Sequence, residues 1–181
     1  MKEKYKYVQN MLSQDVVYFL SSWSTKNFEV NGDPQYRNSF AVHSSKSQIY
    51  QHALHYLHPL MEQETGLSLQ PTYSFNRVYL PGSDLKKHKD RKECEISASI
   101  TLKYNYENKD YKWPLCMGDE PIIIGMGDGV IYKGMEIEHS RPVFTQPTGS
   151  WHHQLFIHYV DKNGPNANCV LDGRLMLGQK I

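Results

Sequence analysis

The chain has 181 residues and a formal net charge of +1. This length is enough for a substantial core, and we expect residues 1–181 to form one domain. The balanced charge gives no electrostatic reason to expect nucleic acid or an anionic membrane surface as a partner. No apolar run approaches the roughly 20 residues that span a bilayer, and the basic start is not followed by the apolar core of a secretory signal.

Cysteine usage bears on the cellular location. The three cysteines, Cys94, Cys116 and Cys169, are widely spaced and odd in number. They form neither a CxxC pair nor a disulfide framework, which favours a reducing, cytoplasmic location. The oligomeric state is not indicated by any feature of the sequence.

The first 68 residues predict two helices that cover a sheet. The first helix follows Ser13, a residue type that caps helix N-termini, and the second runs from about Ser47 to a stop at Gly66. One face of each helix is apolar at helical spacing. These faces are Leu12, Val16, Phe19, Leu20 and Trp23 in the first helix, and Ile49, Ala53, Leu54, Leu57 and Met61 in the second.

From residue 69 onward the pattern is typical of strands. Residues 96–103 alternate apolar and polar side chains, which predicts a strand with one face of each kind. Short apolar runs separated by glycine-rich turns follow at 121–124, 129–132 and 155–160. Helices followed by many short strands predict a mainly β jelly-roll barrel over 69–161, with the helices packed on one sheet. Residues 162–181 then form a C-terminal tail.

Three side chains suggest a metal site. His88 and Asp90 are two residues apart, so in an extended segment both leave the same face. His139, which follows a Gly-Asp-Gly turn, offers a third ligand. Two histidines and one carboxylate form the facial triad of non-haem Fe(II) oxygenases, which leaves coordination positions open for a cosubstrate and O₂. The alternative is a loop histidine that is hydrogen-bonded to a nearby aspartate.

Four segments together resemble the core of 2-oxoglutarate/Fe(II)-dependent dioxygenases of the prolyl-4-hydroxylase-like type. They are Tyr79-x-x-Gly82, His88-x-Asp90, Gly127-Asp128-Gly129-Val130-Ile131-Tyr132 and His139-x-Arg141-Pro142-Val143. The resemblance covers about residues 73–161 and implies a double-stranded β-helix, the cupin-like form of the jelly roll. It implies that His88, Asp90 and His139 are the iron ligands and catalytic residues.

The same resemblance implies the reaction and its cofactors. These are Fe(II), 2-oxoglutarate and O₂, and the implied reaction hydroxylates an unactivated C–H bond while releasing succinate and CO₂. A peptidyl proline or a small molecule is the implied substrate. The protein would hold the metal with open positions, orient the substrate carbon and keep water out.

The site that would bind the distal carboxylate of 2-oxoglutarate differs from the family pattern. Family members usually carry an arginine or lysine on the last strand, but His152 falls at that position, and a neutral imidazole cannot supply the forked pairing of an arginine. Lys103 is the first candidate replacement, because it is in phase with the polar strand residues; the alternative is a solvated lysine at a strand end. Arg141, two residues after His139, is the other, and it is also a candidate for binding an acidic substrate group. Tyr79 is a candidate hydrogen-bond donor to the cosubstrate, and aromatic packing is the alternative role for its ring.

The substrate pocket can be predicted only in outline. Gln154, Phe156 and His158 share one face of a regular strand with His152, so we expect them to shape the pocket. The polar, tyrosine-rich stretches 24–46 and 104–120 are expected to form lids over the barrel mouth.

Two other interpretations follow from the same residues. Without an arginine or lysine on the last strand, a jelly-roll metal-binding protein or a cupin-like metalloenzyme that does not use 2-oxoglutarate stays open. Histidines also recur three apart on the second helix, at His52, His55 and His58. Helical zinc ligands more often lie four apart, so a polar helix flank is the favoured interpretation.

Overall fold

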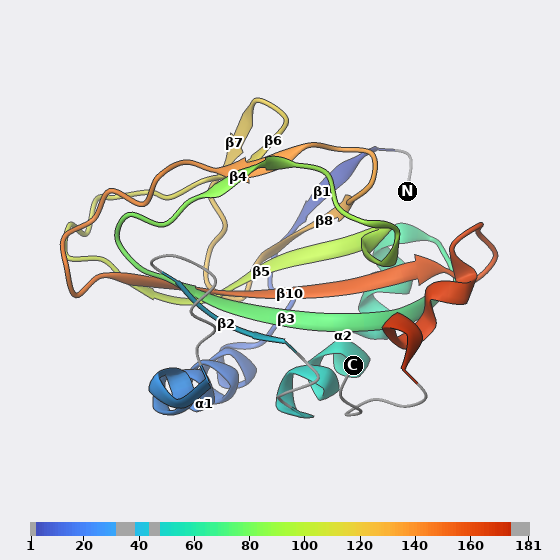
Figure 1. Cartoon of the computed structure of the whole chain (residues 1–181), viewed down its shortest axis with the longest axis horizontal. Helices are drawn as coiled ribbons and strands as arrows, with labels where there is room; N and C mark the ends of the chain where they lie inside the picture. The colour runs from blue at the N-terminus through green and yellow to red at the C-terminus, as the bar shows by residue number, and fades with distance from the viewer. Residues whose placement is uncertain (1–2, 32–38, 44–47, 175–181) are drawn as a thin grey trace.

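The computed structural model describes residues 3–31, 39–43 and 48–174, with side chains at 3–22 and 48–174. Two β-sheets face each other, and two helices cover the outer face of the larger sheet (Figure 1). The helices are α1 (Gln14–Asn31) and α2 (Gln48–Thr65). No helix in the described part of the chain is long and apolar enough to cross a membrane.

The strands are all antiparallel to their neighbours and are divided between two sheets. The larger sheet has the order β1-β8-β5-β10-β3-β2, and the smaller has the order β4-β9-β6-β7. The larger sheet contains β1 (Tyr5–Val8), β2 (Ser39–His43), β3 (Leu69–Tyr79), β5 (Ile96–Asn105), β8 (Gly129–Lys133) and β10 (Trp151–Asp161). The smaller sheet contains β4 (Leu85–His88), β6 (Leu115–Met117), β7 (Glu120–Ile122) and β9 (His139–Arg141). From β3 to β10 the chain crosses repeatedly between the sheets, which confirms the predicted double-stranded β-helix.

The core between the helices and the larger sheet follows the predicted apolar faces. Ile96, Ala98, Ile100 and Leu102 of β5 are buried in one cluster with Leu20 of α1 and Leu54, Leu57 and Met61 of α2. Fully burying one such side chain stabilises the fold by roughly 1.5–3 kcal/mol. The apolar face of β5 therefore faces the helices, and its polar face is turned toward the smaller sheet.

The helix ends agree with the sequence, but one face residue does not. The Val16 N–H donates to Ser13 Oγ at 3.4 Å, and Gly66, at φ +69°, follows the last residue of α2. Phe19 is 62% exposed, and Val17 takes its place in the core. The prediction for Phe19 was wrong because α1 buries a narrower stripe than its apolar residues suggest. The side chain of Trp23 lies outside the described residues.

A bulge between β5 and β10 changes the phase of the polar face. Gln154 pairs with Thr101 but the preceding His153 pairs with Lys103, so Leu102 is an extra residue in the ladder. Lys103 is thereby turned to the helix side, where its Nζ lies 6.0 Å from the ring centroid of Tyr18 in α1. The expectation that Lys103 shares the inner polar face was wrong, because the alternation is interrupted just before it.

The described parts of the two stretches expected to form lids belong mostly to a buried cluster or to helices and strands. Within 104–120, Tyr106 and Trp113 are buried in an aromatic cluster with Tyr79, and β6 joins the smaller sheet. The described parts of 24–46 are the end of α1 and strand β2, and the remainder lies outside the described residues.

Candidate metal centre

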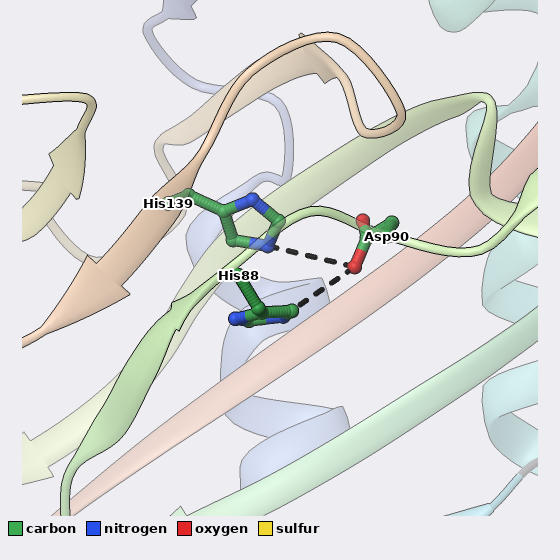
Figure 2. A group of neighbouring side chains, drawn as sticks. All are labelled: His88, Asp90 and His139. Atoms are coloured by element: carbon green, nitrogen blue, oxygen red, sulfur yellow. Dashed lines mark ion pairs between the residues drawn. The ribbon is translucent and has the colours of Figure 1, made fainter.

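Strand pairing in the smaller sheet places two histidines side by side. His88 ends β4 and lies directly opposite His139, which begins β9, and their ring centroids are 4.3 Å apart. Asp90 follows β4 by two residues, and its carboxylate turns toward both rings (Figure 2). Register between two strands, rather than distance along the chain, therefore brings the three predicted side chains together.

Backbone carbonyls fix the tautomer of both histidines. His88 Nδ1 lies 2.7 Å from the carbonyl oxygen of Lys86, and His139 Nδ1 lies 3.3 Å from that of Ile137. A carbonyl oxygen can only accept, so Nδ1 carries the proton in each ring. Each Nε2 then presents a lone pair, as in metal-binding histidines whose other nitrogen donates to a carbonyl.

These lone pairs converge on one carboxylate oxygen. The Nε2 atoms of His88 and His139 lie 3.5 Å and 3.6 Å from Asp90 Oδ1, and the three ligand atoms lie within 4.8 Å of one another. Two unprotonated nitrogens and a carboxylate oxygen attract a cation placed between them. The donor set and its open side fit a divalent metal ion held by a facial triad.

Close backbone packing holds Asp90 in place. Its N–H donates to the Gly134 carbonyl at 2.9 Å, and a Cβ on Gly134 would come within 2.6 Å of Asp90 Oδ2. That oxygen is buried and has no hydrogen-bond partner among the described residues. A buried carboxylate oxygen in this state is costly unless a cation binds it.

The pKa values of the three groups move in different directions. The interaction with Asp90 raises the pKa of His88, whereas burial lowers the pKa of His139. For Asp90, burial favours the neutral acid, but the interactions with His88 and the neighbouring histidines outweigh it and lower the pKa. The carboxylate is therefore ionised near neutral pH.

A cavity of about 390 Å³ adjoins the three side chains. Its other lining residues are Tyr73, Phe75, Arg77, Tyr79, Leu85, Arg91, Tyr132, Phe156 and His158. Of the predicted pocket residues, Phe156 and His158 line it, but Gln154 and His152 do not. The alternating residues 73, 75 and 77 of β3 were not predicted as pocket residues, although their spacing of two with Tyr79 was a usable signal.

Arg141 lies deeper in the barrel, outside this cavity. Its guanidinium lies 4.7 Å above the Trp113 ring and donates to the Trp113 carbonyl and to Gln154 Oε1, each at 3.1 Å. Its Nε has no hydrogen-bond partner, and no carboxylate within the described residues pairs with it. Burial lowers the pKa of Arg141. The Tyr79 hydroxyl is also buried and lacks a partner among the described residues.

Related oxygenases would have an arginine or lysine at the position of His152 on the last strand. In this chain, uncharged side chains joined by hydrogen bonds lie there. Tyr106 Oη lies 2.6 Å from His152 Nδ1, and His152 Nε2 lies 2.7 Å from Gln154 Oε1. Because the amide oxygen only accepts, Nε2 carries the proton and Tyr106 donates to Nδ1. Burial and the nearby Arg141 charge lower the pKa of His152 well below its ordinary value. His152 is therefore neutral and holds Gln154 in place.

The helical histidines do not form a metal site in the described structure. His52 and His55 are exposed, and His58 Nε2 lies 2.9 Å from the Leu69 carbonyl oxygen. None of the three belongs to a cluster of potential ligands among the described residues. This agrees with the polar helix flank favoured by their spacing.

Comparisons with known proteins identify the fold. No family model and no curated protein matches the chain. Among solved structures, a prolyl-4-hydroxylase from Pseudomonas putida is similar, with a TM-score of 0.68, 17% identity and coverage of 88% of this chain and 94% of that one. The α-ketoglutarate-dependent epimerase SnoN from nogalamycin biosynthesis has a TM-score of 0.71 at 12% identity, covering 99% and 91%.

A third similar structure is HygX from Streptomyces hygroscopicus with nickel and 2-oxoglutarate bound. Its TM-score is 0.64 at 10% identity, with 88% of this chain and 84% of that chain covered. The chain therefore has the double-stranded β-helix fold of Fe(II)/2-oxoglutarate-dependent oxygenases, including the prolyl hydroxylases. At these identities the similarity establishes the fold, and the chemistry must be argued from the site.

Proposed function

We propose that the protein is an Fe(II)- and 2-oxoglutarate-dependent oxygenase that hydroxylates an unactivated C–H bond. The observation that carries the proposal is the convergence of His88 Nε2, His139 Nε2 and Asp90 Oδ1 beside an open cavity. When bound, Fe(II) with 2-oxoglutarate and O₂ supplies the oxidising power, and succinate and CO₂ are released. The chain holds the three ligands on one side, so that the opposite positions stay accessible.

The proposed anchor for the distal carboxylate of 2-oxoglutarate is Arg141, assisted by Tyr79. Arg141 and His139 are both buried while Ser140 between them is less so, as expected for alternate residues of one strand. A buried guanidinium without an anion is costly, and a carboxylate would relieve this cost through charge-assisted hydrogen bonds. Lys103 lies on the helix side, and His152 is neutral, so Arg141 is the better supported of the three candidates.

Binding at Arg141 requires side chains to move. Gln154 Oε1 is close to Arg141 Nη2, Thr101 Oγ1 and His152 Nε2, which are all donors. An incoming carboxylate would replace Gln154 Oε1 as an acceptor on the guanidinium. Because Arg141 does not line the cavity, we expect the side chains between it and the cavity to move as the cosubstrate binds.

The cavity indicates a small substrate or one side chain of a peptide. Its volume of about 390 Å³ is in the range of pockets for small ligands. Phe75 and Phe156 form an apolar wall with ring centroids 6.1 Å apart, and Arg77 lies over the Phe75 ring at 5.4 Å. These walls would orient the reacting carbon and exclude water, with a peptidyl proline or a small molecule as the substrate.

The proposal is tested by mixing the protein with Fe(II) and 2-oxoglutarate in the absence of O₂. A weak visible band, which forms when the keto acid binds iron, is the expected result, followed by succinate formation when O₂ is admitted. Trp113 and Gln154 already occupy the surroundings of Arg141, and this supports a second candidate, a cupin-like metalloprotein that does not use 2-oxoglutarate. Bound iron without the visible band would favour that candidate.

A further inference from the structure

A second cluster of ligand atoms lies next to the proposed iron site and includes its aspartate. Asp90, Cys94 and His158 each place one ligand atom within 4.8 Å of the others. They come from separate segments: Asp90 follows β4, Cys94 ends the short 3₁₀ helix η2 (Lys92–Cys94), and His158 lies on β10. Cys94 is 2% exposed and His158 is 6% exposed, so the cluster is shielded from bulk water.

Ser97 determines which nitrogen of His158 can bind a metal. The single hydroxyl proton of Ser97 is donated to the Cys94 carbonyl at 3.0 Å, and Ser97 Oγ lies 2.8 Å from His158 Nδ1. Nδ1 must therefore carry the proton of this contact and donate it to Ser97. In the neutral imidazole, Nε2 then has the lone pair. His88 and His139 have the same tautomer, but there Nδ1 donates to backbone carbonyls.

The two oxygens of Asp90 have different surroundings. Oδ1 lies beside the nitrogens of His88 and His139, whereas Oδ2 is buried without a hydrogen-bond partner among the described residues. If Oδ1 binds the ion held by the triad, Oδ2 is available to bind a second cation. Carboxylates bridge the two ions of two-metal sites in this way.

We propose that Asp90, Cys94 and His158 form a second metal site that takes a borderline or soft divalent cation such as Zn²⁺. A thiolate, an imidazole and a carboxylate are the usual ligands of zinc, and thiolate selects against hard cations. The fourth position faces the cavity, which Asp90 and His158 also line. The second site shares Asp90 with the proposed iron site but does not require oxygenase activity.

Sharing one carboxylate makes the two sites interdependent. A cation on Oδ2 withdraws negative charge from Oδ1, so we expect it to weaken metal binding at His88 and His139. Cysteine binds a metal as the thiolate, so metal binding at Cys94 releases the thiol proton to solvent. Excess Zn²⁺ would then inhibit an iron-dependent reaction through Cys94 as well as by direct exchange at the triad.

The test uses Co(II) as the probe metal, added to the reduced, metal-free full chain without O₂. A near-ultraviolet thiolate-to-Co(II) charge-transfer band is expected in the wild-type protein. Cys94→Ser should remove the band, and His158→Gln should weaken Co(II) binding at this site by about tenfold or more. Matched controls are Cys116→Ser and Cys169→Ser, which should retain it. Circular dichroism checks that each variant is folded.

A triad variant separates this site from the proposed function. His88→Ala/His139→Ala should lose oxygenase activity but retain the thiolate band, because Cys94 and His158 are intact. The second site is refuted by a wild-type spectrum without the band at saturating Co(II), by a band that persists in Cys94→Ser, or by loss of the band in the triad variant. Failure of 2-oxoglutarate turnover alone leaves the expected spectrum unchanged, so the two failures are distinguishable.

Discussion

Two neighbouring regions of the barrel interior, which we call the metal end and the arginine end, differ in how they hold charge. At the metal end, His88, Asp90 and His139 face a cavity of about 390 Å³, and each histidine is fixed by a backbone carbonyl. At the arginine end, two residues along β9 from His139, Arg141 contacts Trp113 and Gln154 and does not line that cavity. The three proposed metal ligands thus already converge, whereas the Arg141 guanidinium is hydrogen-bonded to neutral acceptors.

This difference has a physical cause. A metal site must present several lone pairs at fixed positions, and rigid strands with backbone acceptors supply that arrangement before the ion binds. A buried guanidinium can instead be stabilised provisionally by neutral acceptors and an aromatic face. A mutation at the metal end should therefore impair metal binding, and one at the arginine end should impair 2-oxoglutarate binding, each without the other. The following predictions test this.

The largest effect is expected when the metal end loses its carboxylate. Asp90→Ala removes the one anionic ligand, so we expect Fe(II) binding and 2-oxoglutarate-dependent O₂ uptake to fall by more than about 100-fold. Iron content and O₂ consumption measure the two effects. Lys89→Ala, at the exposed residue between the two ligands, is the matched control and should behave as wild type. Unchanged O₂ uptake in Asp90→Ala would contradict the triad assignment.

The next largest effect should come from the arginine end. Arg141→Met removes the proposed partner of the distal carboxylate, and a charge-assisted hydrogen bond is worth roughly 1.5–3 kcal/mol. We therefore expect the apparent KM for 2-oxoglutarate to rise by at least about tenfold while Fe(II) affinity stays within about twofold. Steady-state kinetics and metal titration measure these separately. A parallel loss of iron binding would mean that the two ends are not independent.

Changes in pH should affect the metal end first. Metal binding needs neutral histidines, and the interaction with Asp90 raises the pKa of His88 above its ordinary value. As the pH falls through that raised pKa, protons compete with the metal, and affinity should drop by about tenfold per pH unit for each proton displaced. Co(II) titrations between about pH 6 and 8 provide the measurement. An affinity independent of pH over this range would exclude His88 as a ligand.

The smallest effect is expected at Lys103. Its cation–π contact with Tyr18 is partly exposed and is worth roughly 0.5–1 kcal/mol at most. Lys103→Met should therefore leave the 2-oxoglutarate requirement within about twofold of wild type and change thermal stability only slightly. Kinetics of Lys103→Met measured beside those of Arg141→Met compare the two anchor candidates directly. A larger rise in KM for Lys103→Met than for Arg141→Met would reverse the assignment.

The sequence by itself determined the features that depend on short-range periodicity. The apolar stripe of α2, the alternation of β5 and the spacing of His88 and Asp90 are all readable, because side-chain direction repeats every 3.6 or two residues. Family motifs added His139, which no local period could have linked to the other two. The structure brings these three together through the register of β4 and β9.

Only the tertiary structure decided which cations face the barrel interior. From the sequence, Lys103 was the first candidate and Arg141 the second, but the bulge at Leu102 turns Lys103 to the helices while Arg141 stays inside. A bulge is one extra residue in a ladder, and its position depends on pairing with another strand rather than on local composition. The cluster of Asp90, Cys94 and His158 arises in a similar way, because β10 brings His158 to two residues that lie four apart in a distant segment of the chain.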